Sequence, residues 1–169
     1  MTRGARPPLI AVCGASEPTA DQAAAAEEVG RRLAEAGVVV LCGGLGGVMA
    51  AAARGARAGG GLSIGLLPGE DADAAAPDID VAIPTGLGEI RNALLARACT
   101  AMIAIGGGYG TLSEVALALR LGRPVAALDS WEVRRPGTAE ADPEIHVVAS
   151  AAEAAAWAVQ RALTLNQTR

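Results

Sequence analysis

The sequence predicts an α/β protein with a Rossmann-like, doubly wound parallel sheet and helices on both faces, a three-layer α/β/α arrangement. Short apolar runs alternate along the chain with helical patterns of roughly 10 to 17 residues, the order of successive βαβ units. Glycine-containing loops follow the apolar runs that end at Cys13, Cys42 and Ile105. A chain of 169 residues is large enough to bury about two thirds of its unfolded surface as one unit. We therefore expect a single domain over residues 1–169.

Seven apolar runs predict the strands of this sheet. Each run is short and rich in Val, Ile, Leu and Ala, as expected for parallel strands that are buried on both faces. Aromatic residues make up only 2% of the chain and Phe is absent, so small aliphatic side chains must build the core. The expected strands are Leu9–Cys13, Val38–Cys42, Leu62–Leu67, Val81–Ile83, Ala101–Ile105, Val125–Leu128 and Ile145–Val148.

Five helical patterns complete the predicted layers. The first has Asp21 as its expected N-cap and ends before Gly37, which suits the C′ position. The last is capped by Ser150, and Glu153 at the third helical position is expected to complete a capping box. The expected helices are Ala20–Ala36, Val48–Ala58, Glu89–Ala98, Leu112–Leu121 and Ala151–Leu165.

Two stretches are predicted to be loops. The stretch from Glu70 to Asp80 is acidic and has no helical or strand periodicity, and a polar turn runs from Arg134 to Pro143. Spaced acids can ligate a cation, but the stretch lacks the glycine-anchored spacing of a calcium loop. A solvated surface loop is therefore the favoured interpretation of residues 70–80.

The basic residues exclude several functions. All fourteen are arginine, whereas a pyridoxal-phosphate enzyme and a P-loop ATPase both require lysine. His146 is the one histidine, which argues against a histidine-rich metal site, and no protein-built metal site is expected. A net charge of −4 without a basic cluster argues against nucleic acid as a partner.

Cysteine spacing and hydropathy indicate the compartment. Cys13, Cys42 and Cys99 show no CxxC spacing and follow apolar segments, so we expect three small buried side chains and no disulfides. The sequence contains no apolar run as long as a membrane span and no signal-peptide core near its start. The expectation is a cytoplasmic protein without a membrane partner.

The segment from Ile105 to Glu114 contains the clearest candidate site. Glycines at positions 106, 107, 108 and 110 link a buried strand to a helix start and let the backbone approach a ligand closely. Unpaired N–H groups and the positive end of the helix dipole at that start suit a phosphate. The candidate ligand residues here are Gly107, Gly108, Tyr109, Gly110 and Thr111.

Two further loops are expected to meet this one, because ligands of doubly wound sheets bind beyond the carboxyl ends of the strands. The first loop has Gly14 but no Gly-x-Gly-x-x-Gly pattern, so an ordinary NAD enzyme is not expected. The candidate ligand residues on these two loops, and on the helix after the second, are Gly14, Ser16, Gly43, Gly44 and Met49.

Four side chains near this rim have two interpretations each. Arg91 can fork onto a phosphate or pair at the surface with Glu89. Glu114 can face the ligand or merely favour the dipole of its helix. Asn92 can bind the ligand or cap the helix start, and Tyr109 can stack on a ring of the ligand or fold back onto the protein.

Several motifs in order resemble those of a known family. They are Gly43-Gly44 through Val48-Met49, Ile64 to Gly69, Thr85 to Gly88 with Arg91-Asn92, and Gly107 to Glu114. Through them the chain resembles the LONELY GUY (LOG) proteins, long mislabelled lysine decarboxylases, and the related molybdenum-cofactor carrier proteins. The resemblance covers nearly the whole chain.

The resemblance implies one of two functions. LOG enzymes hydrolyse the N-glycosidic bond of nucleoside 5′-monophosphates such as cytokinin riboside monophosphates, and their catalytic pair would fall on Glu114 and Arg91. The LOG pattern has Pro where this chain has Gly106, and Lys where it has Asn92. These differences argue against LOG activity. The segment from Thr85 to Gly88 and the helix from Val115 to Leu119 are more similar to the carrier proteins and their uncharacterised bacterial relatives, and the chain is placed nearest to these.

The leading expectation is thus a binding or carrier protein for a phosphate-bearing cofactor or nucleotide, with the phosphate on the Gly107–Thr111 loop. The ligand would be molybdenum cofactor or a nucleoside monophosphate, and the protein would need no other cofactor. A LOG-type phosphoribohydrolase acting on cytokinin riboside monophosphate or AMP is the alternative. The resemblance also implies a homodimer or homotetramer.

Overall fold

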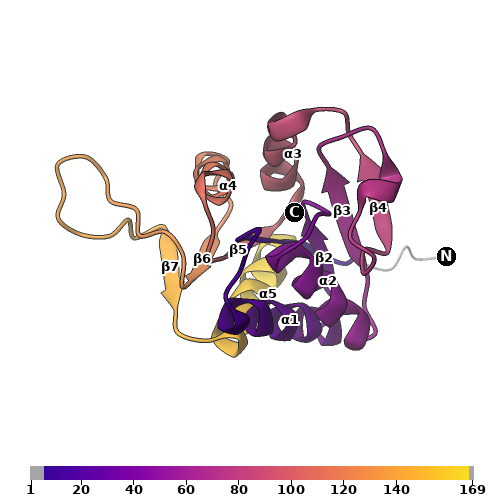
Figure 1. The fold of residues 1–169 in the computed structure, drawn as a ribbon. Helices are drawn as coiled ribbons and strands as arrows, with labels where there is room; N and C mark the ends of the chain where they lie inside the picture. Colours follow the sequence, from indigo (N-terminus) through magenta and orange to yellow (C-terminus); the bar gives the residue numbers. More distant parts are fainter. Residues whose placement is uncertain (1–5, 168–169) are drawn as a thin grey trace.

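A seven-stranded, all-parallel sheet forms the centre of the structure, a computed structural model that describes residues 6–167 (Figure 1). The strand order β4-β3-β2-β1-β5-β6-β7 is that of a doubly wound sheet, as predicted. The first five and last two residues of the expected domain lie outside the described range. The strands are β1 (Leu9–Gly14), β2 (Val39–Cys42), β3 (Ser63–Leu67), β4 (Val81–Pro84), β5 (Ala101–Ile105), β6 (Val125–Leu128) and β7 (Ile145–Val148).

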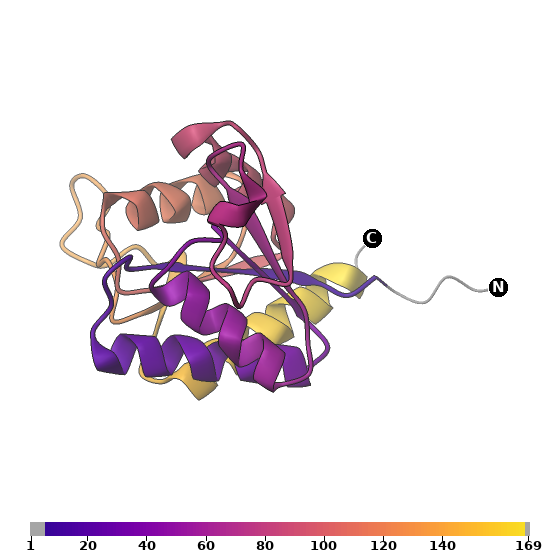
Figure 2. The same cartoon turned by 45° about the vertical axis from the view of Figure 1, so that its right-hand side comes forward.

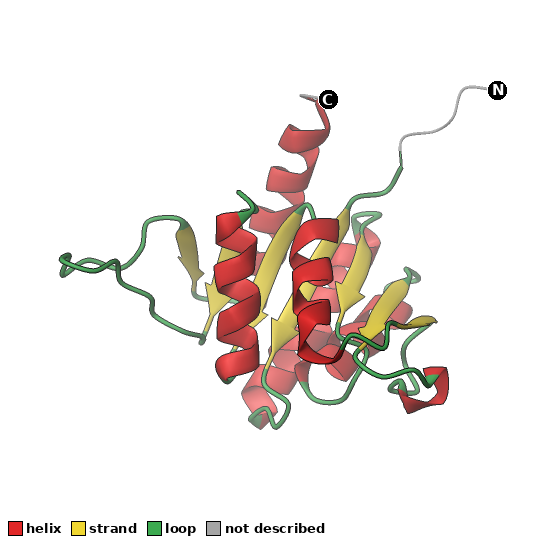
Figure 3. Cartoon of the chain, turned by 90° about the horizontal axis from the view of Figure 1, so that it is seen from above, coloured by secondary structure: helices red, strands yellow, loops and turns green. Residues whose placement is uncertain are grey.

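Helices cover both faces of this sheet, which confirms the three-layer α/β/α prediction (Figures 2 and 3). One face carries three helices and the other carries two, and two short 3₁₀ turns lie in the connections (Ala72–Ala74 and Gly88–Ile90). The helices of the first face are α1 (Ala20–Glu35), α2 (Val48–Ala58) and α5 (Ala151–Gln167). Those of the second are α3 (Arg91–Ala98) and α4 (Tyr109–Arg120).

The strands are buried on both sides, so each contributes alternate residues to two cores. In β1, Ile10 and Val12 face the core under α1, α2 and α5, whereas Ala11 and Cys13 face the core under α3 and α4. Small aliphatic residues dominate both cores, as the composition predicts. All three cysteines are buried and free, as expected.

The two predicted helix caps differ in detail from the structure. Thr19, not Asp21, caps α1: its hydroxyl accepts from the Gln22 N–H at 3.2 Å, and the Gln22 side chain accepts from the Thr19 N–H at 3.1 Å. The threonine therefore forms a complete capping box two residues before Asp21. Gly37 occupies the predicted C′ position with a φ of 75°.

Ser150 caps α5 as predicted, accepting from the Glu153 N–H at 3.2 Å. The Glu153 carboxylate, however, accepts from the Ala149 N–H at 2.9 Å, one residue before the cap. The second half of the predicted capping box is therefore replaced by a bond to the preceding residue.

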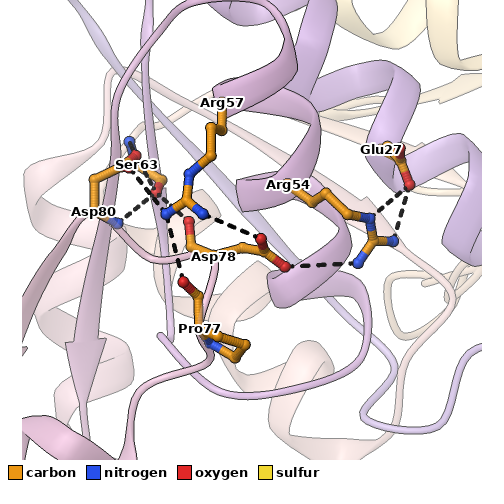
Figure 4. Close-up of polar contacts among 7 residues, drawn as sticks. All are labelled: Glu27, Arg54, Arg57, Ser63, Pro77, Asp78 and Asp80. Atoms are coloured by element: carbon orange, nitrogen blue, oxygen red, sulfur yellow. Dashed lines mark hydrogen bonds and ion pairs between the residues drawn. The ribbon is translucent and has the colours of Figure 1, made fainter.

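The acidic stretch 70–80 is a connection without a strand, as predicted, although it includes the 3₁₀ turn at Ala72–Ala74. Its last two aspartates do not simply face solvent. Asp78 and Asp80 pair with Arg57 of α2 at 3.4 and 3.3 Å, and Asp80 also accepts from the Ser63 hydroxyl at 2.8 Å (Figure 4). These contacts fasten the connection to α2 and to the start of β3.

Candidate functional site

The chain reverses its direction of winding between β1 and β5, and a pocket of about 400 Å³ lies at the carboxyl ends of these strands. The structure brings the three predicted loops together here, because each leaves a parallel strand at the same edge. The lining residues are Gly14, Ser16, Leu45, Met49, Glu89, Arg91, Asn92, Gly108, Gly110, Thr111 and Glu114.

The floor of the pocket is an ion pair between α3 and α4. Arg91 Nη1 lies 3.3 Å from Glu114 Oε1, and both side chains are more than nine-tenths buried. The interpretation of Arg91 as a surface residue paired with Glu89 is therefore wrong. Arg91 Nε is also buried and has no hydrogen-bond partner among the described residues. A buried guanidinium N–H without an acceptor is costly, and other atoms of this side chain line the pocket.

The environment of Glu114 alters its acidity. Burial raises the pKa of this carboxyl to about 7, although Arg91 and a hydrogen bond with Cys13 act in the opposite direction. Burial and the neighbouring Glu114 also raise the pKa of the Cys13 thiol well above its usual value. Glu114 thus exchanges its proton near neutral pH, which is a property of catalytic carboxyls and of groups that adjust to an incoming anion.

Two helices point uncapped N-termini at the pocket. In α4 the N-cap is Gly108, in α2 it is Gly47, and in neither case does a side chain of the described structure make a capping bond. Helix α1, by contrast, is capped by its own Thr19. The buried Thr111 adds a hydroxyl in the first turn of α4. In α2 the Val48 N–H already donates to the Ala15 carbonyl oxygen at 3.0 Å. The start of α4, with its N–H groups, positive dipole end and hydroxyl, is therefore the part that suits a phosphate.

Helix α4 starts at Tyr109, three residues before the predicted start at Leu112. The chain turns earlier than expected because Gly106 and Gly107 both adopt positive φ, at 56° and 111°. Gly108 is therefore the N-cap, and Gly110 and Thr111 lie in the first helical turn rather than in the loop.

Three of the predicted glycines shape the pocket without lining it. A Cβ on Gly43 would lie 2.4 Å from Arg91 Nη2, so this glycine makes room for the guanidinium. A Cβ on Gly107 would lie 2.4 Å from the Thr111 hydroxyl oxygen. Gly44 has a φ of 77°, and a Cβ on it would lie 2.8 Å from Leu67 Cδ2.

Tyr109 and Asn92 differ in their position relative to the pocket. Tyr109 is 82% exposed, its ring contacts the Trp131 ring with centroids 5.6 Å apart, and it is not among the lining residues. Stacking of this ring on a ligand stays a prediction. Asn92 does line the pocket, and its side-chain amide donates to the Ser113 hydroxyl at 3.1 Å. Because no side chain caps α3, the interpretation of Asn92 as a helix cap is wrong.

Two lining residues were not predicted: Leu45 and Glu89. Leu45 lies in the glycine-rich loop after β2, and the prediction that this loop reaches the pocket was enough to include it. Glu89 lies on the 3₁₀ turn just before Arg91. The sequence suggested it only as an ion-pair partner for a surface Arg91, and not as a residue of the pocket.

No three acidic, histidine or cysteine side chains within residues 6–167 are grouped to hold a metal ion. No helix of that range has the length and apolar character needed to cross a membrane.

The fold and the pocket define a Rossmann-like protein with an open pocket at the switch point of the sheet. The chain belongs to the SLOG cluster4 family, whose sequence model matches residues 7–156. An uncharacterized protein of Archaeoglobus fulgidus is 44% identical over 119 residues, 70% of this chain and 78% of that protein.

Solved structures of molybdenum cofactor carrier and binding proteins are similar to this chain over nearly its whole length. The molybdenum cofactor carrier protein of Chlamydomonas reinhardtii is 35% identical, with a TM-score of 0.79 over 95% of this chain and 99% of that one. The molybdenum cofactor binding protein of Rippkaea orientalis is 31% identical, with a TM-score of 0.77 over 98% of both chains. The predicted LOG-like family with molybdenum-cofactor carrier relatives is thus confirmed. DNA processing protein A of Streptococcus pneumoniae, at 22% identity and a TM-score of 0.67, shares the fold alone.

Proposed function

We propose that this protein binds and carries a phosphate-bearing cofactor or nucleotide, with molybdenum cofactor as the leading candidate. The observation that carries the proposal is the buried Arg91 guanidinium, which lines the same pocket as the uncapped start of α4. A phosphate placed between this guanidinium and the start of α4 would accept from both.

The pocket fits such a ligand in size and polarity. Its volume of about 400 Å³ falls within the range of about 300 to 1,000 Å³ common for small-molecule sites. The phosphate would occupy the end formed by Gly108, Gly110 and Thr111, and the rest of the ligand would lie toward Ser16, Leu45 and Met49. The cofactor would be cargo, released intact.

Two observations favour a carrier over a hydrolase. The relatives described as molybdenum cofactor carrier or binding proteins align with nearly the whole of this chain. Gly106 has a φ of 56°, and a proline at this position, as in the hydrolase pattern, is restricted to a φ of about −65°. The loop as built here thus does not accommodate the hydrolase sequence.

A second function, LOG-type hydrolysis of a nucleoside 5′-monophosphate, is favoured by one specific observation. Glu114 has a pKa of about 7 and lines the pocket beside Arg91. Its carboxylate could stabilise the oxocarbenium-like centre or activate water, while Arg91 holds the phosphate.

One experiment distinguishes the two functions. The purified protein and its Glu114→Gln variant are incubated with AMP, cytokinin riboside monophosphates and other nucleoside 5′-monophosphates, and release of ribose 5-phosphate is measured. A carrier releases none, and the variant keeps or gains affinity for the phosphate ligand because a negative charge beside the anion is gone. Turnover that disappears in the variant would contradict the carrier proposal and establish the hydrolase.

A further inference from the structure

We propose that Asp129–Trp131, the segment after β6, is a positioning segment that holds the glycine loop (Gly106–Gly108) in its anion-binding conformation. The inference rests on the proposed function, because it assumes that the start of α4 receives the phosphate. None of the three residues lines the pocket. Their effect on a ligand would therefore be exerted through the loop.

Two hydrogen bonds connect the positioning segment to the loop. The Ser130 hydroxyl donates to the Gly106 carbonyl oxygen at 2.6 Å, and Trp131 Nε1 donates to the Gly108 carbonyl oxygen at 3.0 Å. A carbonyl oxygen turned toward a phosphate would repel it. The Ser130 bond holds the Gly106 carbonyl, and the Trp131 bond adds to the Leu112 N–H, which donates to the Gly108 carbonyl oxygen at 3.0 Å. With both carbonyls engaged, the N–H groups at the start of α4 remain for the ligand.

The segment begins with local backbone strain. Asp129 has a φ of 46° and is the one non-glycine residue with positive φ in the described range. Such a conformation costs about 1 kcal/mol or more and persists only where neighbouring contacts impose it. Here the Asp129 carboxylate accepts from Gln22 Nε2 at 2.7 Å. That amide lies directly against the loop, 2.7 Å from the position that a Cβ on Gly106 would take.

An aromatic contact adds a third connection. The Trp131 ring packs on the Tyr109 ring, with centroids 5.6 Å apart and an angle of 34° between the planes. Tyr109 is the first residue of α4, so this contact fixes the helix start that follows the loop. The chain contains one Tyr, two Trp and no Phe, and two of these three rings meet here.

The contacts are separate from the cores that stabilise the fold. Within the described structure, neither Ser130 nor Trp131 belongs to the two buried hydrophobic clusters. Conservative substitutions of these residues should therefore alter the loop and leave the global stability nearly unchanged. The remaining tryptophan, Trp157, stacks on His146 at 5.1 Å and packs against the core under α1, α2 and α5, far from the loop in sequence. Its replacement by Phe controls for the loss of a tryptophan elsewhere, and its melting temperature is measured beside those of the other variants.

The first test needs no ligand. Hydrogen–deuterium exchange over residues 105–112 is compared for the wild type, Ser130→Ala, Trp131→Phe and the control Trp157→Phe. Trp131→Phe retains an aromatic ring and removes the N–H donor. We expect exchange in this peptide to accelerate about fivefold in the first two variants, the effect of losing one hydrogen bond, and not in the control. Unchanged exchange in both variants would overturn the positioning inference, whatever the ligand is.

The second test measures binding of AMP and of adenosine by isothermal titration calorimetry. Trp131→Phe and Ser130→Ala should each weaken AMP binding about fivefold and leave adenosine binding unchanged, because the loop contacts the phosphate alone. Equal losses for both probes, accompanied by a lower melting temperature, would indicate a merely structural role and overturn the inference.

The two proposals fail in different ways. If the wild type binds neither AMP nor inorganic phosphate at millimolar concentration, the anion site of the proposed function is contradicted, while the exchange data still decide whether Asp129–Trp131 holds the loop. If the wild type binds AMP and the variants bind it equally well, the positioning inference fails and the proposed function stands.

Discussion

Arginine–carboxylate pairs occur in two contrasting regions of this molecule. On the α1–α2 face, Arg54 and Arg57 lie among Glu27, Asp78 and Asp80, and each guanidinium contacts more than one acceptor (Figure 4). These arginine side chains are 47% and 50% exposed. At the pocket, Arg91 and Glu114 are buried and make a single contact with each other, at 3.3 Å.

The difference shows which pair is available for function. The exposed network is paired within the protein, and such solvent-exposed pairs contribute little stability. The buried pair retains an unpartnered Nε, as far as the described residues extend, and a carboxyl with a raised pKa. Burying two charges without completing their hydrogen bonds is unfavourable. We interpret this pair, whose two residues line the pocket, as the part of the molecule that faces a ligand.

Replacing Arg91 should have the largest effect. Arg91→Met leaves Glu114 buried without its cation, so we expect a loss of about 3 kcal/mol in the free energy of unfolding at pH 8.5. Binding of AMP should weaken by about 10-fold to 100-fold. Arg97→Met is the matched control, because Arg97 lies on the same helix but is exposed. Urea denaturation and calorimetry measure both effects, and equal behaviour of the two variants would remove the contrast between the regions.

The pH dependence of stability tests the other member of the buried pair. The pKa of Glu114 is raised from 4.5 to about 7, so the folded protein binds this proton more tightly than the unfolded chain. The resulting stability is fully present below about pH 4.5 and is lost as the pH rises through 7, a change of about 3 kcal/mol.

The control for this profile is Glu114→Gln, whose side chain does not titrate. Its free energy of unfolding, measured by urea denaturation between pH 5 and 8.5, should lack the decline seen in the wild type. The same slope in both proteins would show that Glu114 does not carry the raised pKa.

A pair of glycine substitutions tests how the pocket accommodates Arg91. A Cβ on Gly43 would lie 2.4 Å from Arg91 Nη2 and 2.6 Å from Met49 Sδ, whereas one on Gly46 would meet nothing within 4 Å. Gly43→Ala should therefore displace the guanidinium and cost about 1 to 3 kcal/mol. Gly46→Ala in the same loop should be close to neutral. If the melting temperatures of the two variants coincide, Gly43 is not what makes room for Arg91.

The exposed network should give the smallest effect. Arg54 contacts Glu27 at 2.9 Å and Asp78 at 3.8 Å with a half-exposed side chain. Arg54→Ala should change the free energy of unfolding by no more than about 0.5 kcal/mol, and less in 0.5 M salt than in 0.05 M, because solvent and salt screen the pairs. A loss as large as that of Arg91→Met would show that this face is not merely a solvated network.

Periodicity was sufficient to predict the sheet, because parallel strands buried on both faces form continuous apolar runs such as Ala101–Ile105. Helix ends differed from the prediction where one residue sets the local backbone. The Thr19 side chain caps α1 in place of Asp21, and α4 starts three residues before its predicted start because of the preceding glycines. The loops after β1, β2 and β5 could be predicted to meet from the fold class alone, because the carboxyl ends of parallel strands lie at the same edge of the sheet.

The finer arrangement of the site could not be predicted in the same way. The sequence gives no measure of burial for Arg91 and Glu114, which only the packing of α3 against α4 brings together. Nor does any local pattern connect Ser130 and Trp131 with a loop more than twenty residues earlier. Such contacts depend on the pairing of β5 with β6, a long-range feature.

The most direct test of the central claim is native mass spectrometry of the protein purified from cells that make molybdenum cofactor, beside its Arg91→Met and Arg97→Met variants. Our account predicts a retained phosphate-bearing ligand on the wild type and on Arg97→Met, and its loss from Arg91→Met. A ligand retained equally by all three proteins, or by none, would contradict the assignment of the Arg91–Glu114 pocket as the cofactor site.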